Sequence, residues 1–312
     1  MVSNQRLVFS WAWHTTPERE SLVTIMLEPD GAGTLLILHH EQFADERRVR
    51  QAREPYCLKP THAEEPVMQS HHIVSREEWI EARKAHLAHE KEFTRARDRL
   101  SEERRALPWV KVDEEYVFDG PGGRQTLADL FRGRSQLVVQ HFMFAPDWNE
   151  GCKSCSFWAD GFERMIPHLA ARDTTLVAIS RAPLPKLDAF KARMGWTFDW
   201  FSSAGSDFNH DYAVSFSPEE IKSGARIYNF GTSGFGVEEA PGISVFYRDE
   251  AGQIFHTYSC FARGLDMMNA AYQYLDLTPL GRHEEGLPYP MDWLRLRDQY
   301  APAVGPAASR KS

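Results

Sequence analysis

The sequence predicts an α/β protein built around a mixed sheet with helices on both faces. Two apolar runs, at 135–144 and 174–180, are typical of buried strands, and a helical segment follows each of them. Two later runs, at 241–249 and 252–260, predict an antiparallel pair, and a last helix follows at 264–277. Parallel strands joined by helices and completed by an antiparallel hairpin form a sheet that is covered on both faces.

The chain before the first central strand adds a hairpin to this plan. Residues 115–131 predict two short strands around the turn Gly-Pro-Gly-Gly at 120–123, and then a short helix. After the second central strand, residues 184–195 predict another helix.

A long helix is expected at 75–105. Ser75 and Glu78 have the spacing of a capping box, and Pro108 follows the end of the segment. The helix should be charged all round except for one narrow stripe that repeats every seven residues, made of Trp79, Ala82, His86, His89, Phe93, Ala96 and Leu100. We therefore expect it to lie along the domain or along a partner in a homodimer, with its histidines on the surface.

The first fifty residues predict a small antiparallel sheet. Strand-like runs occupy 6–14, 21–29 and 33–41, with a hairpin turn at 30–33, and 42–51 begins like a helix. The stretch ESLVTIMLEPDGAGTLLILHHEQFADE resembles the C-terminal part of the START-like (SRPBCC) fold, in the branch related to heat-shock ATPase activators. Residues 1–50 are thus expected to be a partial START-like β fragment, which is too small to form a full core by itself.

The remaining boundaries follow from composition. Residues 51–72 combine prolines with mixed charge and have no periodicity, which is typical of a linker. Residues 73–300 then form the α/β domain with its N-terminal helical extension, and 301–312 are expected to be a disordered tail.

Composition also restricts the class of partner. The 312 residues carry a net charge of −8, whereas nucleic acids and anionic membranes favour a basic surface. The chain has no signal-peptide pattern at its start and no run of about 18 apolar residues. We therefore expect a cytoplasmic protein with neither nucleic acid nor membrane as a partner.

The strongest candidate for chemistry is the pair Cys152 and Cys155, which lies between a buried strand and the start of a helix. In a reducing compartment a close cysteine pair is more often catalytic or metal-binding than structural. The positive end of the helix should lower the pKa of the Cys152 thiol, and Lys153 adds a positive charge beside it. Cys155, one turn further along, could then resolve the mixed disulfide that Cys152 forms with a substrate.

Several other residues could support this dithiol. Pro241 precedes the strand expected beside the first central strand, where a cis proline would turn the backbone toward the sulfur atoms. An acid or base near Cys155 would help to deprotonate it. Polar residues near the predicted strand ends that could take this role are His141, Arg181, Asp207, His210 and Arg263.

The order of elements resembles the thioredoxin-like fold. More closely, 68–300 resembles a bacterial thioredoxin-like family catalogued as domain of unknown function 899, through blocks such as FMFAPDWNEGCKSCSFWADGF, MGWTFDWFSSAGSDFNHDY and LPYPMDW. The resemblance implies a dithiol–disulfide oxidoreductase that uses Cys152 and Cys155 on a protein or small-molecule disulfide, with an unknown reductant and no cofactor. Trp148 lies four residues before Cys152, whereas thioredoxin has a tryptophan next to its first cysteine.

Three alternatives remain open. A peroxiredoxin-like peroxidase would have Pro and Thr upstream of its cysteine in the pattern P-x-x-x-T-x-x-C, but here Pro146 precedes Cys152 without an intervening Thr. A zinc site would need two further ligands, for which only His256 and Cys260 are candidates, so no metal is expected. An interaction protein on the same fold would leave the cysteines incidental. Cys57 is expected to be an unpaired exposed thiol.

Overall fold

The computed structural model describes the backbone of four strands within residues 5–57, and residues 71–300 apart from 225–226 and 233–235. The chain divides into two compact units, Met1–Ser70 and His71–Ser312. The helix expected from residue 42 and the tail at 301–312 lie outside the described residues.

The first unit contains an antiparallel sheet. Its strands are β1 (Gln5–Trp13), β2 (Thr16–Asp30), β3 (Gly33–Glu41) and β4 (Tyr56–Cys57), and they pair in that order. The pairing of Asp30 with Gly33 closes the β2–β3 hairpin at the predicted turn. The short β4 was not predicted, because its two residues fall in the segment that the composition assigns to a linker.

The second unit begins with α2 (Arg76–Arg105), which has a complete capping box at its first turn. Ser75 Oγ accepts a hydrogen bond from Glu78 N, and Ser75 N donates one to the Glu78 carboxylate. None of the thirty residues of α2 is buried. Trp79, Phe93 and Leu100 of the predicted stripe are about half or more exposed, at 47%, 68% and 52%.

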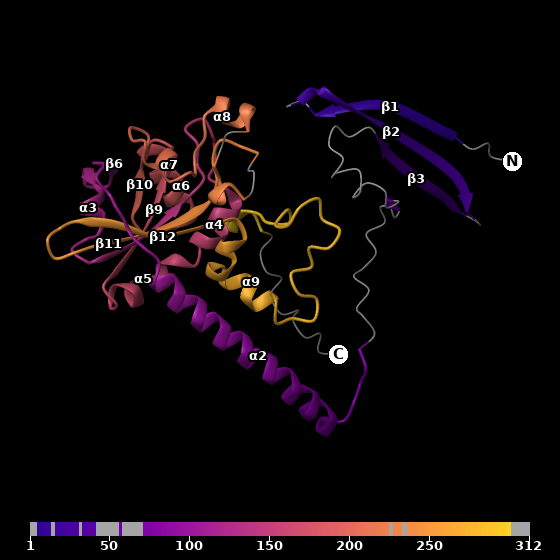
Figure 1. The fold of residues 1–312 in the computed structure, drawn as a ribbon, viewed down its shortest axis with the longest axis horizontal. Coiled ribbons are helices and arrows are strands. Elements are labelled where there is room, and N and C mark those ends of the chain that lie inside the picture. The colour runs from indigo at the N-terminus through magenta and orange to yellow at the C-terminus, as the bar shows by residue number, and fades with distance from the viewer. Residues whose placement is uncertain are drawn as a thin grey trace, which may run out of the picture. The chain divides into compact units, whose positions relative to one another are not determined.

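The main sheet of the second unit runs in the order β5-β12-β11-β8-β9-β10-β6-β7. Figure 1 labels β6, β9, β10, β11 and β12 of this sheet. Neighbours β8, β9 and β10 are parallel, and the other pairs are antiparallel. The strands are β5 (Val110–Lys111), β6 (Val117–Gly120), β7 (Gly123–Thr126), β8 (Gln136–His141), β9 (Thr174–Ser180), β10 (Trp200–Ser202), β11 (Gly242–Arg248) and β12 (Ile254–Phe261).

The helices of this unit follow the predicted alternation with the strands. They are α3 (Leu127–Leu130), α4 (Lys153–Ala159), α5 (Phe162–Ala170), α6 (Leu184–Met194), α7 (Phe208–Asp211), α8 (Pro218–Ser223) and α9 (Ala270–Leu275), with short 3-10 helices η1 (Asn229–Gly231), η2 (Ala262–Met268) and η3 (Arg297–Gln299). No helix among the described residues is long and apolar enough to cross a membrane.

The sheet separates two hydrophobic cores. Successive residues of a strand point to opposite faces, so each central strand contributes to both cores. On one face, Leu137 and Val139 of β8 pack with residues of α3 and α7. On the other face, Phe142 packs with residues of α4, α5 and α6. The prediction of a mixed sheet with helices on both faces is therefore confirmed.

Two details differ from the sequence prediction. The last helix, expected at 264–277, is divided into η2 and α9, because Asn269 takes an extended conformation and caps α9 through its side chain. The third parallel strand, β10, was missed because it has only three residues within an aromatic stretch.

A buried ion pair joins the chain segments that flank the central strand. Arg181, just after β9, donates to the Glu239 carboxylate over 2.8 Å, and Ser215 Oγ donates to the other carboxylate oxygen over 2.8 Å. Glu239 lies shortly before β11, so the pair spans the two neighbours of β8. Burial raises the pKa of Glu239 to about 7, against the opposite effect of its hydrogen bonds and of the Arg181 charge.

The first prediction concerns independent folding. A truncated chain that starts at Met68 should melt in one cooperative transition at the temperature of the full chain, because both cores are formed by residues after 115. Circular dichroism of the two chains under identical conditions measures this. Aggregation or a gradual transition of the truncated chain would show that the N-terminal strands belong to its core.

The second prediction concerns Glu239. Its pKa is higher in the folded protein than its ordinary value of 4.5, so the folded state retains a proton that the unfolded state has lost. The free energy of unfolding should therefore fall as pH rises from about 4.5 to 7, by on the order of 3 kcal/mol.

Urea unfolding at several pH values tests this in three proteins. Glu239→Gln should remove most of the decrease, whereas Glu238→Gln, at the exposed neighbouring position, should retain it. Parallel curves for the protein and its Glu239→Gln variant would contradict the assignment.

Candidate active site

The two central cysteines lie where the chain turns from the first central strand into a helix. Cys152 is the N-cap residue of α4, and its carbonyl accepts hydrogen bonds from both the amide and the hydroxyl of Ser156, each 2.9 Å long. The Cys152 amide donates to Met143 O over 3.0 Å, which fixes the end of the loop against the strand that precedes it. The predicted strand–loop–helix setting of the cysteines is therefore present.

Cys152 and Cys155 differ in their exposure. Cys152 is partly exposed, whereas Cys155 is fully buried in the core between the sheet and α4. No disulfide joins them in the structure. A reagent in solution therefore reaches Cys152 first.

Their pKa values shift in opposite directions. The Cys155 thiol donates a hydrogen bond to the Cys152 sulfur, and with further hydrogen bonds from Cys155 N and Ser154 it lowers the pKa of Cys152 to about 7, despite partial burial. Burial raises the pKa of Cys155 well above its ordinary value, and the Cys152 thiolate beside it raises it further. Cys152 is thus the more acidic thiol and is about half ionised near pH 7, whereas Cys155 keeps its proton.

Trp148 and Lys153 lie beside the cysteine pair. Trp148 packs against the core that contains Cys155, and its carbonyl accepts a hydrogen bond from Lys186 Nζ over 3.0 Å. Lys153 Nζ donates to Asp292 O over 3.3 Å, so this side chain holds the C-terminal segment. Hydrogen bonds account for the lowered pKa of Cys152, rather than the Lys153 charge that the sequence suggested.

The C-terminal segment after α9 also packs on α4. Trp293 meets Phe157 of α4 edge to face, with 5.8 Å between the ring centres. Leu296 joins the core around Cys155. Glu284 anchors the segment by accepting hydrogen bonds from Tyr272 Oη, Met291 N and Trp293 Nε1.

Pro241 lies next to the first residue of β11 but does not have the conformation considered for it. Every described peptide bond is trans, including the one before Pro241. The Pro241 carbonyl accepts a hydrogen bond from Tyr228 Oη over 2.8 Å, and the same hydroxyl accepts one from Ala262 N over 3.0 Å. Burial raises the pKa of Tyr228 to about 12, and the neighbouring Cys155 and Cys260 also contribute, so Tyr228 lies within electrostatic reach of the dithiol.

His141 lies on the opposite face of the sheet from α4. Its ring stacks near Tyr212 and Phe208 in the other core, and its Nε2 forms a 2.8 Å hydrogen bond with Ser244 Oγ. Burial lowers the pKa of His141 to about 3. The prediction that His141 acts as an acid or base near Cys155 is therefore wrong, because β8 directs this side chain away from the cysteines.

The other polar candidates form separate contacts. Arg181 is engaged with Glu239, and Arg263 is exposed and pairs with Asp266 over 2.9 Å. His210 is exposed on α7, and Asp207 is the exposed N-cap residue of the same helix. No described hydrogen bond or ion pair links these residues to the cysteines.

Sequence reasoning missed two residues: Gln140, which contacts the dithiol helix, and Tyr228, which interacts electrostatically with Cys155. Gln140 of β8 is buried and its Nε2 donates to Cys155 O over 3.4 Å. A glutamine inside an otherwise apolar strand was the available signal. Tyr228 had no such signal, because only the folded chain brings it near Cys155.

The described part of the chain contains no set of side chains that could bind the zinc ion considered above. Among the residues that the structure describes, no three His, Cys, Asp or Glu side chains are grouped to hold a metal ion. His256 Nε2 is 2.7 Å from Ser259 Oγ, and the Cys260 thiol is buried with a raised pKa. Cys57 lies in the part of the chain whose side chains are not described.

Solved structures similar to this chain include two peroxiredoxin-type proteins. A mutant of PrxQ from Xylella fastidiosa is 14% identical with a TM-score of 0.33, over 51% of this chain and 89% of that one. Peroxidoxin BcpB from Mycobacterium tuberculosis is 14% identical with a TM-score of 0.35, over 54% and 95%. A protein assigned as the thiol:disulfide interchange protein DsbE, from Chlorobium tepidum, is also 14% identical with a TM-score of 0.31, over 53% and 97%.

Family comparisons divide the chain in two. A search of curated proteins gives no match. Residues 1–56 match the family described as activator of Hsp90 ATPase homolog 1-like protein, in agreement with the START-like resemblance. Residues 68–300, about three quarters of the chain, match the family described as bacterial protein of unknown function (DUF899), and the chain therefore belongs to this family.

Proposed function

We propose that the protein is a thiol–disulfide oxidoreductase in which Cys152 is the nucleophile and Cys155 the resolving thiol. The observation that carries the proposal is the opposite pKa shift of two adjacent thiols, of which the partly exposed one is the stronger acid. A thiolate at neutral pH is the form that attacks disulfides, and a buried thiol beside it is protected from other reagents.

The proposed reaction has two exchange steps. The Cys152 thiolate attacks one sulfur of a substrate disulfide, which breaks the substrate S–S bond and releases one substrate thiolate that takes a proton from water. Cys155 then loses its proton and attacks Cys152 Sγ, which releases the second substrate thiol and leaves a Cys152–Cys155 disulfide. The substrate gains two electrons, and an external thiol or dithiol must return two electrons to the protein.

The structure supports the second step in two ways. The hydrogen bond between the two thiols brings Cys155 next to Cys152 Sγ. Once Cys152 is in a mixed disulfide it carries no negative charge, so its contribution to the raised pKa of Cys155 disappears. The substrate disulfide can belong to a protein or to a small molecule. Both exchange steps use only Cys152 and Cys155, so they are the same for the two kinds of substrate.

The third prediction tests the thiolate. Labelling of Cys152 by iodoacetamide should be half-maximal near pH 7 and should decrease below it, because only the thiolate reacts. Cys155→Ala should move this midpoint toward the ordinary thiol value, since it removes the main hydrogen bond, whereas Cys260→Ala should not. Mass spectrometry of the labelled peptides measures each site. A midpoint near pH 9 in the unmodified protein would favour the interaction protein instead.

The fourth prediction tests turnover. With dithiothreitol as reductant, the protein should reduce a small aromatic disulfide, and Cys152→Ser should lose all activity above background. In a separate reaction without dithiothreitol, Cys155→Ser should accumulate one equivalent of mixed disulfide, visible as a mass increase that added dithiothreitol removes. Turnover of hydrogen peroxide without any turnover of disulfides would replace this proposal with a peroxidase.

A further inference from the structure

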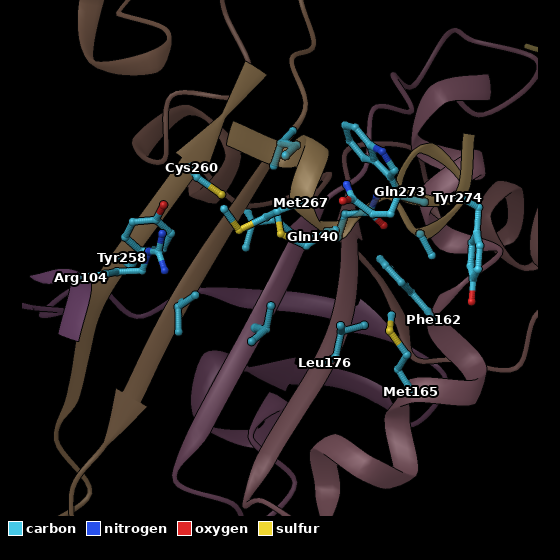
Figure 2. Close-up of a pocket in the computed structure, with 17 residues that line it drawn as sticks. Arg104, Gln140, Phe162, Met165, Leu176, Tyr258, Cys260, Met267, Gln273 and Tyr274 are labelled. Carbon is cyan, nitrogen blue, oxygen red and sulfur yellow. The ribbon is translucent and has the colours of Figure 1, made fainter. Parts of the chain in front are cut away.

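An apolar cavity of about 640 Å³ lies on the face of the sheet that α4 and α5 cover (Figure 2). Its floor follows from the strand register, in which one row across β12, β11, β8 and β9 consists of Tyr258, Val245, Val138 and Leu176. Strands lie about 4.8 Å apart, so this row spans roughly 14 Å. The volume is within the usual range for small-molecule sites, about 300 to 1,000 Å³.

Several of the residues that line the cavity are large, apolar and exposed. Met165 of α5 is 41% exposed, Met267 of η2 57% and Tyr274 of α9 74%. The cavity is therefore open to solvent on this side. A molecule with an apolar part that enters it covers these side chains, and the removal of apolar surface from water favours its binding.

One end of the floor carries a positive charge. Figure 2 shows Arg104 beside Tyr258, at the opposite end of the cavity from Met165 and Leu176. The Arg104 guanidinium lies over the Tyr258 ring, with 4.8 Å between its carbon atom and the ring centre. Arg104 is the one charged side chain among the described lining residues. The cavity thus combines a long apolar floor with a single cation at one end.

The contact with Tyr258 leaves the Arg104 guanidinium free to bind an anion. A cation–π contact uses the flat face of the group, whereas its five N–H donors point outward in its plane. Between the residues that the structure describes, no hydrogen bond or ion pair uses the Arg104 side chain. A carboxylate matches such a fork of donors, because its two oxygen atoms can accept two parallel hydrogen bonds.

We propose that this cavity binds an amphiphile with a carboxylate head and an alkyl tail, such as a medium-chain fatty acid. The carboxylate accepts hydrogen bonds from the Arg104 guanidinium, and the tail lies along the row from Tyr258 to Leu176. A positively charged head would be repelled by Arg104, and a second charge at the far end of the tail would lie against apolar side chains. This inference does not depend on the proposed redox function.

The experiment is calorimetric titration of the full chain with decanoate, octanoate, 1-decanol and decylammonium. Near pH 7 the carboxylate is ionised, and each ligand is kept below the concentration at which it forms micelles. Decanoate should bind, and decanol, which has the same tail, should bind about tenfold more weakly because it forms no hydrogen bond between two charged groups. Octanoate should also bind about tenfold more weakly than decanoate, since it buries two fewer methylene groups. Decylammonium should bind more weakly than decanol.

These comparisons use the unmodified protein, so they do not depend on the folding of a variant. The proposal is overturned if decanoate does not bind, or if decanol or decylammonium binds as tightly as decanoate does. Equal affinities of octanoate and decanoate would contradict the placement of the tail along the floor.

Two substitutions locate the carboxylate. Arg104→Met should weaken decanoate binding about tenfold without weakening decanol binding. Arg105→Met removes the same charge from the neighbouring exposed position, which does not line the cavity, so decanoate should bind to it as it does to the unmodified protein. Equal losses in the two variants would reveal an effect of net charge and would contradict a contact with Arg104.

Sedimentation of the same samples tests a different occupant, a second copy of the chain. A dimer that binds no decanoate would assign the cavity to the contact between the two copies and would overturn the proposal.

Discussion

The alternation of side chains along β8 is the constraint on which the rest of the second unit depends. β8 lies between β11 and β9, so its backbone is paired on both sides and its register cannot slip without moving both neighbours. Leu137, Val139 and His141 point into one core, and Val138, Gln140 and Phe142 point toward the other. A shift of one residue would exchange the two sets.

The position of the dithiol is a direct result of this register. The amide of Cys152 bonds to Met143 O, one residue after Phe142, so the start of α4 is set by where the strand ends. From the same strand, Gln140 Nε2 donates a hydrogen bond to the Cys155 carbonyl. The same alternation excludes His141 from the site, although it is closer in sequence to the cysteines than Gln140 is.

Much of the fold could be read from the sequence because it depends on local patterns. A few neighbouring residues determine each of these features: the apolar runs of β8 and β9, the capping box at Ser75 and the hairpin turn after β6. The cysteine pair was equally visible, since it is a local spacing before a helix. Residues that depend on long-range contacts were not. The Arg181–Glu239 pair and the approach of Tyr228 to Cys155 join segments about 50 residues or more apart, and no periodicity encodes them.

The C-terminal segment shows why the domain needs residues beyond its sheet. Leu296 completes the core around Cys155, and Trp293 covers Phe157 on the outer side of α4. A seven-residue helix is too short to be stable by itself, so these contacts contribute to its stability. Three sets of contacts thus fix the cysteine pair: those with the end of β8, those with the core and those with the C-terminal segment.

Helix α2 has a different source of stability. Because it buries none of its residues, it depends on its capping box and on surface ion pairs such as Arg83–Glu90 and Lys84–Glu81. Surface ion pairs are screened by dissolved salt, whereas burial in the two cores is not. The helix and the sheet therefore respond to different properties of the solvent: ionic strength acts on the first, and agents that weaken the hydrophobic effect act on the second.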